Sequence, residues 1–189
     1  LYRVYQELLR KEKTLAVIGL GYVGLPLALE FARHFRVIGF DINRKRVEYM
    51  QQGIDPSKEL DVEAFAHTDI LFTDDPEQLR KAQFFIVAVP TDIDEHKTPD
   101  LSPLKKASSS VGKFLKPGDY VVYESTVYPG CTEEDCLPIL ERESTLKLGV
   151  DFKIGYSPER IVPGDKSRPL TQILKIVSGS DPEALQEIS

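Results

Sequence analysis

The sequence has little of what several classes of protein require. Its 189 residues contain two cysteines, Cys131 and Cys136, which are too few for a disulfide framework. Their spacing also differs from that of a zinc ribbon or a redox CxxC pair, so we expect reduced thiols. The three histidines, His34, His67 and His96, lack the spacing of metal ligands, and we therefore predict no metal site.

Excess positive charge and long apolar runs are also missing. The chain has 24 Lys and Arg residues against 30 Asp and Glu, a net charge of -6, which argues against nucleic acid or anionic lipid as a partner. The most apolar run, residues 84–89, is far shorter than the roughly 20 residues that span a bilayer, and residues 1–13 have no signal-peptide core. We therefore expect a cytoplasmic protein that acts on a small molecule.

Short runs rich in β-branched and aromatic residues predict seven strands, separated by helical stretches. The runs lie at residues 14–19, 36–41, 70–73, 84–89, 120–125, 152–157 and 174–179. Several are apolar without alternation, as strands buried on both faces by crossover helices must be. The sequence therefore predicts an α/β fold: a Rossmann-like, doubly wound, mainly parallel sheet with helices on both faces.

Both ends of the chain are predicted to be helical. Near the start, Val4, Tyr5, Leu8 and Leu9 share one helical stripe with Leu1, which is typical of a short amphipathic helix. The final residues, SDPEALQEIS, are typical of a capped helix just beginning, and the chain does not start with Met. We expect it to be part of a longer protein.

A glycine-rich loop follows the first predicted strand and precedes a helical run. Its sequence is GLGYVG, with Tyr22 and Val23 between the second and third glycines. In such a loop Gly19 permits a tight turn, Gly21 lets a pyrophosphate approach the backbone, and Gly24 lets helix and strand pack closely. The helix N-terminus adds amide donors, so we expect an anionic ligand there.

An acidic residue in the right place makes a bland glycine turn the weaker interpretation. Asp41 ends the second predicted strand 22 positions after Gly19, where the acid that binds the adenosine ribose is expected. Arg44, Lys45 and Arg46 follow and could suit the 2′-phosphate of NADP, but Asp41 would repel that group. We therefore predict an N-terminal helix over residues 1–13 and an NAD-binding domain over residues 14–189.

Polar residues also follow three later strands. Because ligands of open α/β sheets bind beyond the carboxyl ends of the strands, these residues are further candidates for the site. They are Pro90 and Thr91 after the fourth strand, Ser125 and Thr126 after the fifth, and Ser157, Pro158, Glu159 and Arg160 after the sixth.

Each of these candidates has a plainer alternative. Thr126 could orient a water or a substrate oxygen, or could simply cap the following helix. Glu159 could act as a general base, or could be a solvated turn residue paired with Arg160. Cys131 lies near a helix start, where a thiol pKa can fall, but we expect it to serve packing.

Four strings of residues together resemble one known family. GLGYVGLPLALEFA, VAVPT, YESTVYPG and GYSPERIVPGD occur in that order and are similar to the UDP-glucose/GDP-mannose dehydrogenase family over essentially the whole chain. STVYPGCTEE and YSPER most resemble its UDP-N-acetylhexosamine branch. The resemblance implies two oxidations of the sugar C6 alcohol to a carboxylate by two NAD+, through a cysteine-bound thiohemiacetal and thioester, for surface polysaccharide synthesis.

The resemblance also implies roles for individual residues. The pyrophosphate is expected at Gly19 to Gly24, the adenosine end at Asp41 and Arg46, and the nicotinamide side at Pro90, Thr91, Ser125 and Thr126. Catalytic roles are implied for Thr126 and Glu159, and substrate binding for Glu159, Arg160 and Ile161. Two positions depart from the family pattern, namely Asp92 in place of Pro and Val162 in place of Asn.

The family's catalytic cysteine, lysine and aspartate match nothing in this chain, so they are expected in a later segment. We therefore expect the chain to bind NAD without turnover, and the complete enzyme to form a dimer or larger assembly. The alternatives are a UDP-glucose or UDP-N-acetylmannosamine dehydrogenase, a β-hydroxyacid dehydrogenase, or a non-catalytic NAD-sensing module. A β-hydroxyacid dehydrogenase shares the glycine loop but does not explain STVYPG or YSPER.

Overall fold

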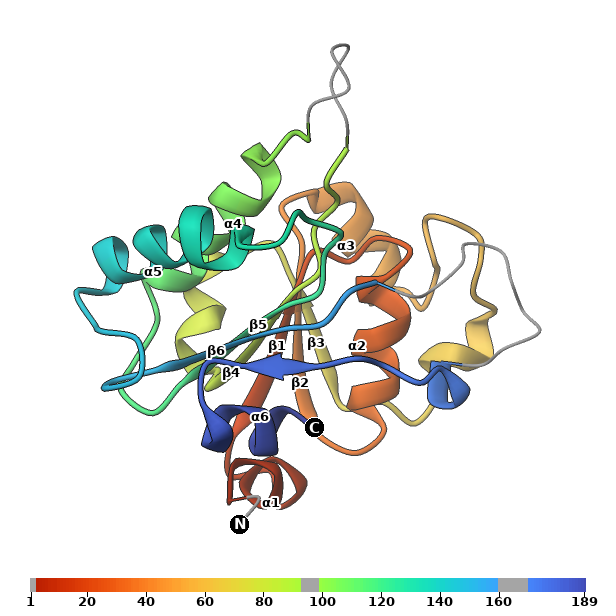
Figure 1. Ribbon diagram of the computed structural model, residues 1–189. Helices are drawn as coiled ribbons and strands as arrows, with labels where there is room; N and C mark the ends of the chain where they lie inside the picture. Colours follow the sequence, from red (N-terminus) through yellow and green to blue (C-terminus); the bar gives the residue numbers. More distant parts are fainter. Residues whose placement is uncertain (1–2, 93–98, 160–169) are drawn as a thin grey trace.

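The fold is a single seven-stranded sheet with helices on both faces (Figure 1). The computed structural model describes residues 3–92, 99–159 and 170–189. In sequence order the strands are β1 (Thr14–Ile18), β2 (Arg36–Phe40), β3 (Ile70–Thr73), β4 (Phe84–Val87), β5 (Tyr120–Tyr123), β6 (Lys153–Tyr156) and β7 (Ser178–Gly179). Their order across the sheet is β3-β2-β1-β4-β5-β6-β7. Strands β1 to β6 are parallel and β7 is antiparallel to β6, which confirms the predicted Rossmann-like α/β fold.

Each predicted strand is present, but the seventh is much shorter than predicted. Residues 174–179 were expected to form it, whereas β7 consists of two residues only. Leu174 and Ile176, the apolar side chains that suggested a strand, are 84% and 59% exposed. Between them, Lys175 forms an ion pair with Glu124, so this stretch is held by a side chain rather than by a strand ladder.

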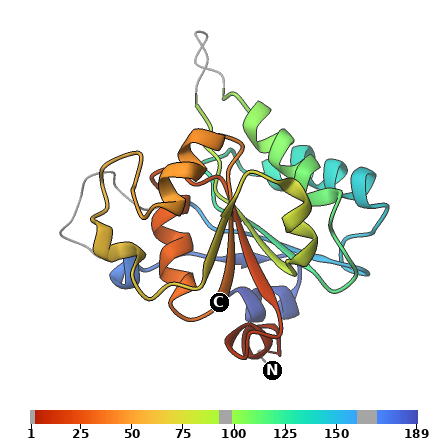
Figure 2. The ribbon, with the colours of Figure 1, turned by 180° about the vertical axis from the view of Figure 1, so that it is seen from behind.

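The alternation of side chains along β1 divides the protein into two cores. The described α-helices are α1 (Arg3–Leu9), α2 (Gly24–Ala32), α3 (Arg44–Gln51), α4 (Ser102–Gly112), α5 (Leu137–Ser144) and α6 (Pro182–Ile188), with short 3-10 helices η1 (Val62–Phe65), η2 (Pro76–Lys81) and η4 (Leu170–Gln172) and a short π-helix η3 (Thr132–Cys136). Leu15 and Val17 pack with α1, α2, α3 and α6, whereas Ala16 and Ile18 pack with η2, α4 and α5. Figure 2 shows α2 and α3 on one side of the strands and η2, α4 and α5 on the other.

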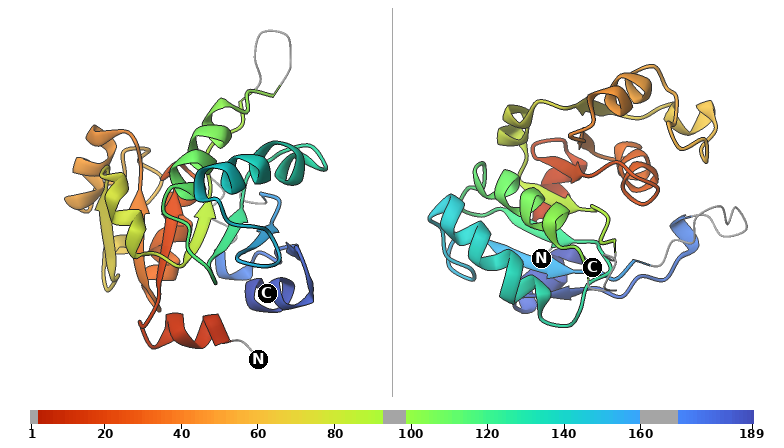
Figure 3. Two further views of the ribbon diagram at one scale, coloured as in Figure 1. Left: turned by 90° about the vertical axis from the view of Figure 1, so that its left-hand side faces the viewer. Right: turned by 90° about the horizontal axis from the view of Figure 1, so that it is seen from above.

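The first and last helices lie side by side, at one end of the molecule (Figure 3). The Glu187 carboxylate accepts backbone N–H groups at the start of α1, from Arg3 at 2.7 Å and Val4 at 3.0 Å. Val4 and Leu8 are buried, whereas Tyr5 is 43% exposed, so the buried stripe of α1 is narrower than predicted. Among the described residues, no helix is long and apolar enough to cross a membrane.

The strand register brings the candidate residues to one edge of the sheet. The last residues of β1, β2, β4, β5 and β6 pair across the sheet as neighbours: Ile18, Phe40, Val87, Tyr123 and Tyr156. The segments that follow these five strands therefore all begin at the same edge of the sheet. Strand β2 lies on one side of β1 and β4 lies on the other, so the strand order reverses at β1. The glycine loop follows β1 and therefore lies at the point of reversal, where such sheets bind ligands.

Candidate functional site

The glycine loop occupies a space too tight for side chains at two of its three glycines. Gly19 has a φ of +89°, and a Cβ there would lie 2.9 Å from the Ala88 carbonyl oxygen. A Cβ at Gly24 would overlap the carbonyl oxygen of Gly19. Gly19 thus allows the turn against β4, and Gly24 allows the start of α2 to pack against the loop, as predicted for such a motif.

The remaining glycine of the loop, Gly21, leaves room for a ligand. A Cβ at Gly21 would meet nothing within 4 Å, so the loop offers open space over its backbone. No side chain caps the N-terminus of α2, which begins at Gly24 after the N-cap residue Val23. Uncapped amide donors and the positive end of the helix dipole suit a pyrophosphate. The residues present therefore fit a dinucleotide, with Tyr22 exposed at the loop surface.

Asp41 and Arg46 hold Leu20 of the loop through the two peptide groups on either side of its Cα atom. The Leu20 N–H donates to Asp41 Oδ2 at 2.9 Å, and Arg46 Nη2 donates to the Leu20 carbonyl oxygen at 2.9 Å. Asp41 Oδ1 accepts the Asn43 N–H at 2.8 Å, and Arg46 also reaches Ser57 Oγ at 3.3 Å. Asp41 therefore lies at the glycine loop, as its spacing predicted, and Arg46, which the family resemblance implied, lies there as well.

Two hydrogen bonds join the segments that follow β4 and β5. Thr91 Oγ1 donates to the Thr126 carbonyl oxygen at 2.6 Å, and Ser125 Oγ donates to the Val89 carbonyl oxygen at 2.8 Å. Ser125 is buried, whereas Thr126 and Pro90 are exposed at the sheet edge. The structure thus brings together the four residues that the sequence placed after these two strands.

Thr126 does not cap the following helix. The π-helix η3 begins at Thr132, and its N-cap residue is Cys131, which makes no side-chain capping hydrogen bond. Tyr128, in the segment between Thr126 and η3, donates its hydroxyl to the Asp135 carboxylate. Asp135 also forms an ion pair with Lys105 of α4 at 2.7 Å. The helix-cap alternative for Thr126 is therefore excluded, and Thr126 is exposed at the sheet edge.

Neither cysteine has the surroundings of a nucleophile. Both are free thiols and fully buried in the core beneath α4 and α5. Burial raises the pKa of Cys131, and raises that of Cys136 to about 12. His34 and His67 are exposed, and His96 lies outside the described residues. In the described part of the chain, no cluster of His, Cys, Asp and Glu could hold a metal ion.

The candidate substrate residues are only partly within the described structure. Glu159 follows β6 at the same sheet edge and is partly buried. Arg160, Ile161 and Val162 lie outside the described residues. Asp92 is exposed, and its carbonyl oxygen accepts the Asp100 N–H at 2.7 Å.

Two charged residues at this edge are absent from the candidates that the sequence offered. Glu124, directly before Ser125, is only 6% exposed and forms an ion pair with Lys175. Burial lowers the pKa of Lys175 to about 8. Ser157, which the sequence did offer as a candidate, directly follows β6 and is 2% exposed. The sequence held a signal for both residues, because Glu124 ends the apolar run YVVYE and Lys175 lies within the apolar run ILKIV. A charge in such surroundings is costly without a partner, so each residue could have been predicted to form an ion pair.

Two known proteins with similar sequences carry the same name. The chain is 56% identical over 174 residues to UDP-N-acetyl-D-glucosamine 6-dehydrogenase of Pseudomonas aeruginosa, an alignment covering 92% of this chain and 41% of that protein. It is 54% identical over 170 residues to the enzyme of the same name from Salmonella typhi, covering 89% of this chain and 40% of that protein. The chain thus spans about two fifths of the length of these relatives.

Solved structures and a family model agree with these relatives. The fold superposes with a TM-score of 0.85 on the NDP-N-acetyl-D-galactosaminuronic acid dehydrogenase from Methanosarcina mazei Go1, at 32% identity, over 97% of this chain and 42% of that one. Residues 13–189 match the model of the UDP-glucose/GDP-mannose dehydrogenase family, NAD binding domain. The chain therefore belongs to the UDP-glucose/GDP-mannose dehydrogenase family and comprises its NAD-binding domain.

Proposed function

We propose that this domain binds NAD+ across the glycine loop. The observation that carries the proposal is the contrast within the loop, where Gly19 and Gly24 are enclosed by backbone while Gly21 faces open space. The pyrophosphate lies over Gly21 at the N-terminus of α2, and Tyr22 and Val23 border it. Backbone N–H groups and the helix dipole supply the positive potential there.

In this proposal, the adenosine ribose lies at Asp41. Its carboxylate already accepts two backbone N–H groups, from Leu20 of the loop and from Asn43, which fixes its orientation beside the loop. A carboxylate accepts hydrogen bonds from ribose hydroxyls but repels a 2′-phosphate, so NAD+ is preferred over NADP+. Arg46, held against the Leu20 carbonyl, borders the adenosine.

The nicotinamide side is formed by Pro90, Thr91, Ser125 and Thr126. Hydrogen bonds between the two segments hold these residues at the sheet edge, and Thr126 is exposed for contact with water or substrate. NAD+, when bound, supplies a hydride acceptor. Glu159, at the same edge, takes up or returns the proton of the substrate alcohol.

We further propose that the complete protein is a UDP-N-acetylhexosamine 6-dehydrogenase, which oxidises C6 to a carboxylate with two NAD+ for surface polysaccharide synthesis. The names of relatives at 56% and 54% identity support this substrate class. Glu159, Arg160 and Ile161 provide this domain's share of the sugar site. The catalytic cysteine, lysine and aspartate, a cytoplasmic location and an assembly of at least two subunits remain predictions for the complete protein.

Two experiments test these proposals separately. In the isolated domain, addition of NAD+ shifts backbone amide NMR signals most at residues 19–24, 41–43 and 124–127, whereas shifts confined to other regions contradict the site. In the complete protein, NADH formation is compared for UDP-N-acetylglucosamine, UDP-N-acetylmannosamine and UDP-glucose. Faster turnover of UDP-glucose would contradict the substrate class without affecting the NAD site.

A further inference from the structure

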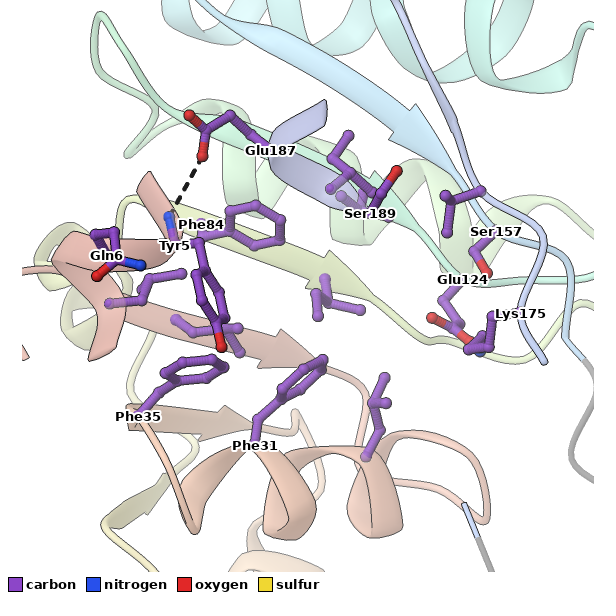
Figure 4. A pocket seen from close by; sticks show the side chains of 17 residues that line it. Tyr5, Gln6, Phe31, Phe35, Phe84, Glu124, Ser157, Lys175, Glu187 and Ser189 are labelled. Carbon is purple, nitrogen blue, oxygen red and sulfur yellow. Dashed lines mark hydrogen bonds and ion pairs between the residues drawn. The ribbon is translucent and has the colours of Figure 1, made fainter. Parts of the chain in front are cut away.

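A buried ionic cluster lies directly behind the turn that contains Ser125 and Thr126. It consists of Glu124, Lys175 and Ser157, and we call it the β5 cluster. Glu124 follows β5, Ser157 follows β6, and Lys175 comes from the stretch before β7. The Lys175 ammonium pairs with the Glu124 carboxylate, and all three residues line one end of the same cavity (Figure 4).

Because the β5 cluster lies in largely apolar surroundings, each of its two charges needs the other as a partner for the fold to be stable. The cavity has a volume of about 480 Å³, and its other walls are largely apolar, with Phe31 of α2 and Val122 of β5 among them. The side chains of Glu124 and Lys175 are 6% and 21% exposed. A buried ion whose partner is removed is strongly destabilising, so neither charge is tolerated alone.

The β5 cluster is coupled to the cofactor turn through the backbone. The Glu124 N–H donates to the Val87 carbonyl oxygen at 2.8 Å, which continues the β4–β5 ladder by one residue. The next side chain, Ser125, donates to Val89. Successive side chains along a strand point to opposite faces, so anchoring Glu124 in the cavity fixes the direction in which Ser125 leaves the sheet.

We propose that Lys175 is a positioning residue for the cofactor site, whose ion pair with Glu124 holds the end of β5 so that Ser125 and Thr126 face the nicotinamide side of the bound dinucleotide. The inference rests on the proposed NAD+ site. The proposal assigns a role at the cofactor edge to the stretch before β7, where the sequence predicts a strand. Lys175 itself does not touch the cofactor in this proposal.

A matched ion pair elsewhere in the sheet provides the control. Lys153 of β6 pairs with Asp181, the N-cap residue of α6, and with Glu183 at 3.3 Å. Its side chain is 17% exposed, close to the 21% of Lys175. Lys153 begins β6, so it lies at the amino end of the strand, away from the cofactor edge. We therefore expect replacement of Lys153 to lower the stability of the domain without affecting the turn at Ser125 and Thr126.

The experiment measures thermal stability and NAD+ affinity in four variants of the domain. We expect Lys175→Met to lower the melting temperature and to weaken NAD+ binding about tenfold. The double variant Glu124→Gln/Lys175→Met removes both charges, so it recovers stability but still binds about tenfold more weakly. Lys175→Arg keeps the pair and retains affinity, while Lys153→Met loses stability with affinity within about twofold of wild type.

Two results would overturn the inference: wild-type affinity in the double variant, or an equal loss of affinity in Lys153→Met. If the wild-type domain binds no NAD+, the proposed function fails instead. Hydrogen–deuterium exchange of residues 120–128 then decides the positioning role by itself. Faster exchange in the double variant supports it, and unchanged exchange contradicts it.

Discussion

The loop after β1 and the turn after β5 lie at the same edge of the sheet, but different contacts hold them. The glycine loop is held by close packing of its own backbone and by Asp41 and Arg46, which lie 21 and 26 residues from Leu20. The turn is held by hydrogen bonds to the segment after β4, with Thr91 and the Val89 carbonyl 35 and 36 residues away along the chain, and by the Glu124–Lys175 pair. One half of the site is thus shaped locally, and the other by the assembled sheet.

The comparison predicts the largest effect at Gly24. In Gly24→Ala the new Cβ overlaps the Gly19 carbonyl oxygen, which belongs to backbone and cannot rotate away. We expect a loss of about 3 kcal/mol in the free energy of unfolding, at the upper end of overpacking costs, and loss of NAD+ binding with it. Chemical denaturation measures the first quantity, and calorimetric titration measures the second.

Gly21→Ala is the matched control, because its Cβ meets no atom of the protein within 4 Å. Its stability should stay within about 0.5 kcal/mol of wild type. NAD+ binding should nevertheless weaken, since the methyl group takes space assigned to the pyrophosphate. Equal losses of stability in the two variants would contradict the difference between an enclosed and an open glycine.

The next effect concerns Asp41. Asp41→Ala removes an ionised acceptor from the Leu20 and Asn43 N–H groups and from the proposed ribose site. Hydrogen bonds to charged groups contribute about 1.5–3 kcal/mol, so NAD+ affinity should fall about 10- to 100-fold. Asp151→Ala serves as the control, because Asp151 likewise accepts a backbone N–H, from Lys147 at 2.8 Å, but before β6. An equal loss of affinity in the control would show a general effect of destabilisation.

A smaller effect is expected at Thr91. Thr91→Val removes the hydrogen bond to the Thr126 carbonyl, which contributes about 1 kcal/mol to stability, and frees the segments after β4 and β5 from each other. NAD+ affinity should fall several-fold in a calorimetric titration. Thr68→Val loses a similar bond, to the Phe65 carbonyl at 2.8 Å, before β3. If both variants bind alike, the link between the two segments does not matter for the cofactor.

The smallest effect is expected at the cysteines. Burial raises the pKa of both thiols, so Cys131 and Cys136 stay protonated at pH 8, and the thiolate is the reactive form. Iodoacetamide at pH 8 should leave the folded domain unmodified and NAD+ binding unchanged, whereas both thiols react in denaturant. Mass spectrometry measures the modification. Rapid alkylation of the native domain would contradict the buried, unreactive state.

The same comparison explains what the sequence could predict. Gly19, Gly24 and Asp41 were predictable because the loop and the residue after β2 are set by short-range spacing and by the steric needs of a turn. The link from Thr91 to Thr126 was predictable only as nearness at one edge, since the register of β4 and β5 forms with the sheet. The Glu124–Lys175 pair was missed because its partners meet only in the folded protein, and the apolar residues around Lys175 favoured a strand.

The central claim is that this domain holds NAD+ between the glycine loop and Asp41. Isothermal titration of the wild-type domain with NAD+ and with NADP+ tests it most directly. The account predicts saturable one-site binding of NAD+ and clearly weaker binding of NADP+, whose 2′-phosphate meets the Asp41 carboxylate. Absence of saturable NAD+ binding, or tighter binding of NADP+, would contradict it.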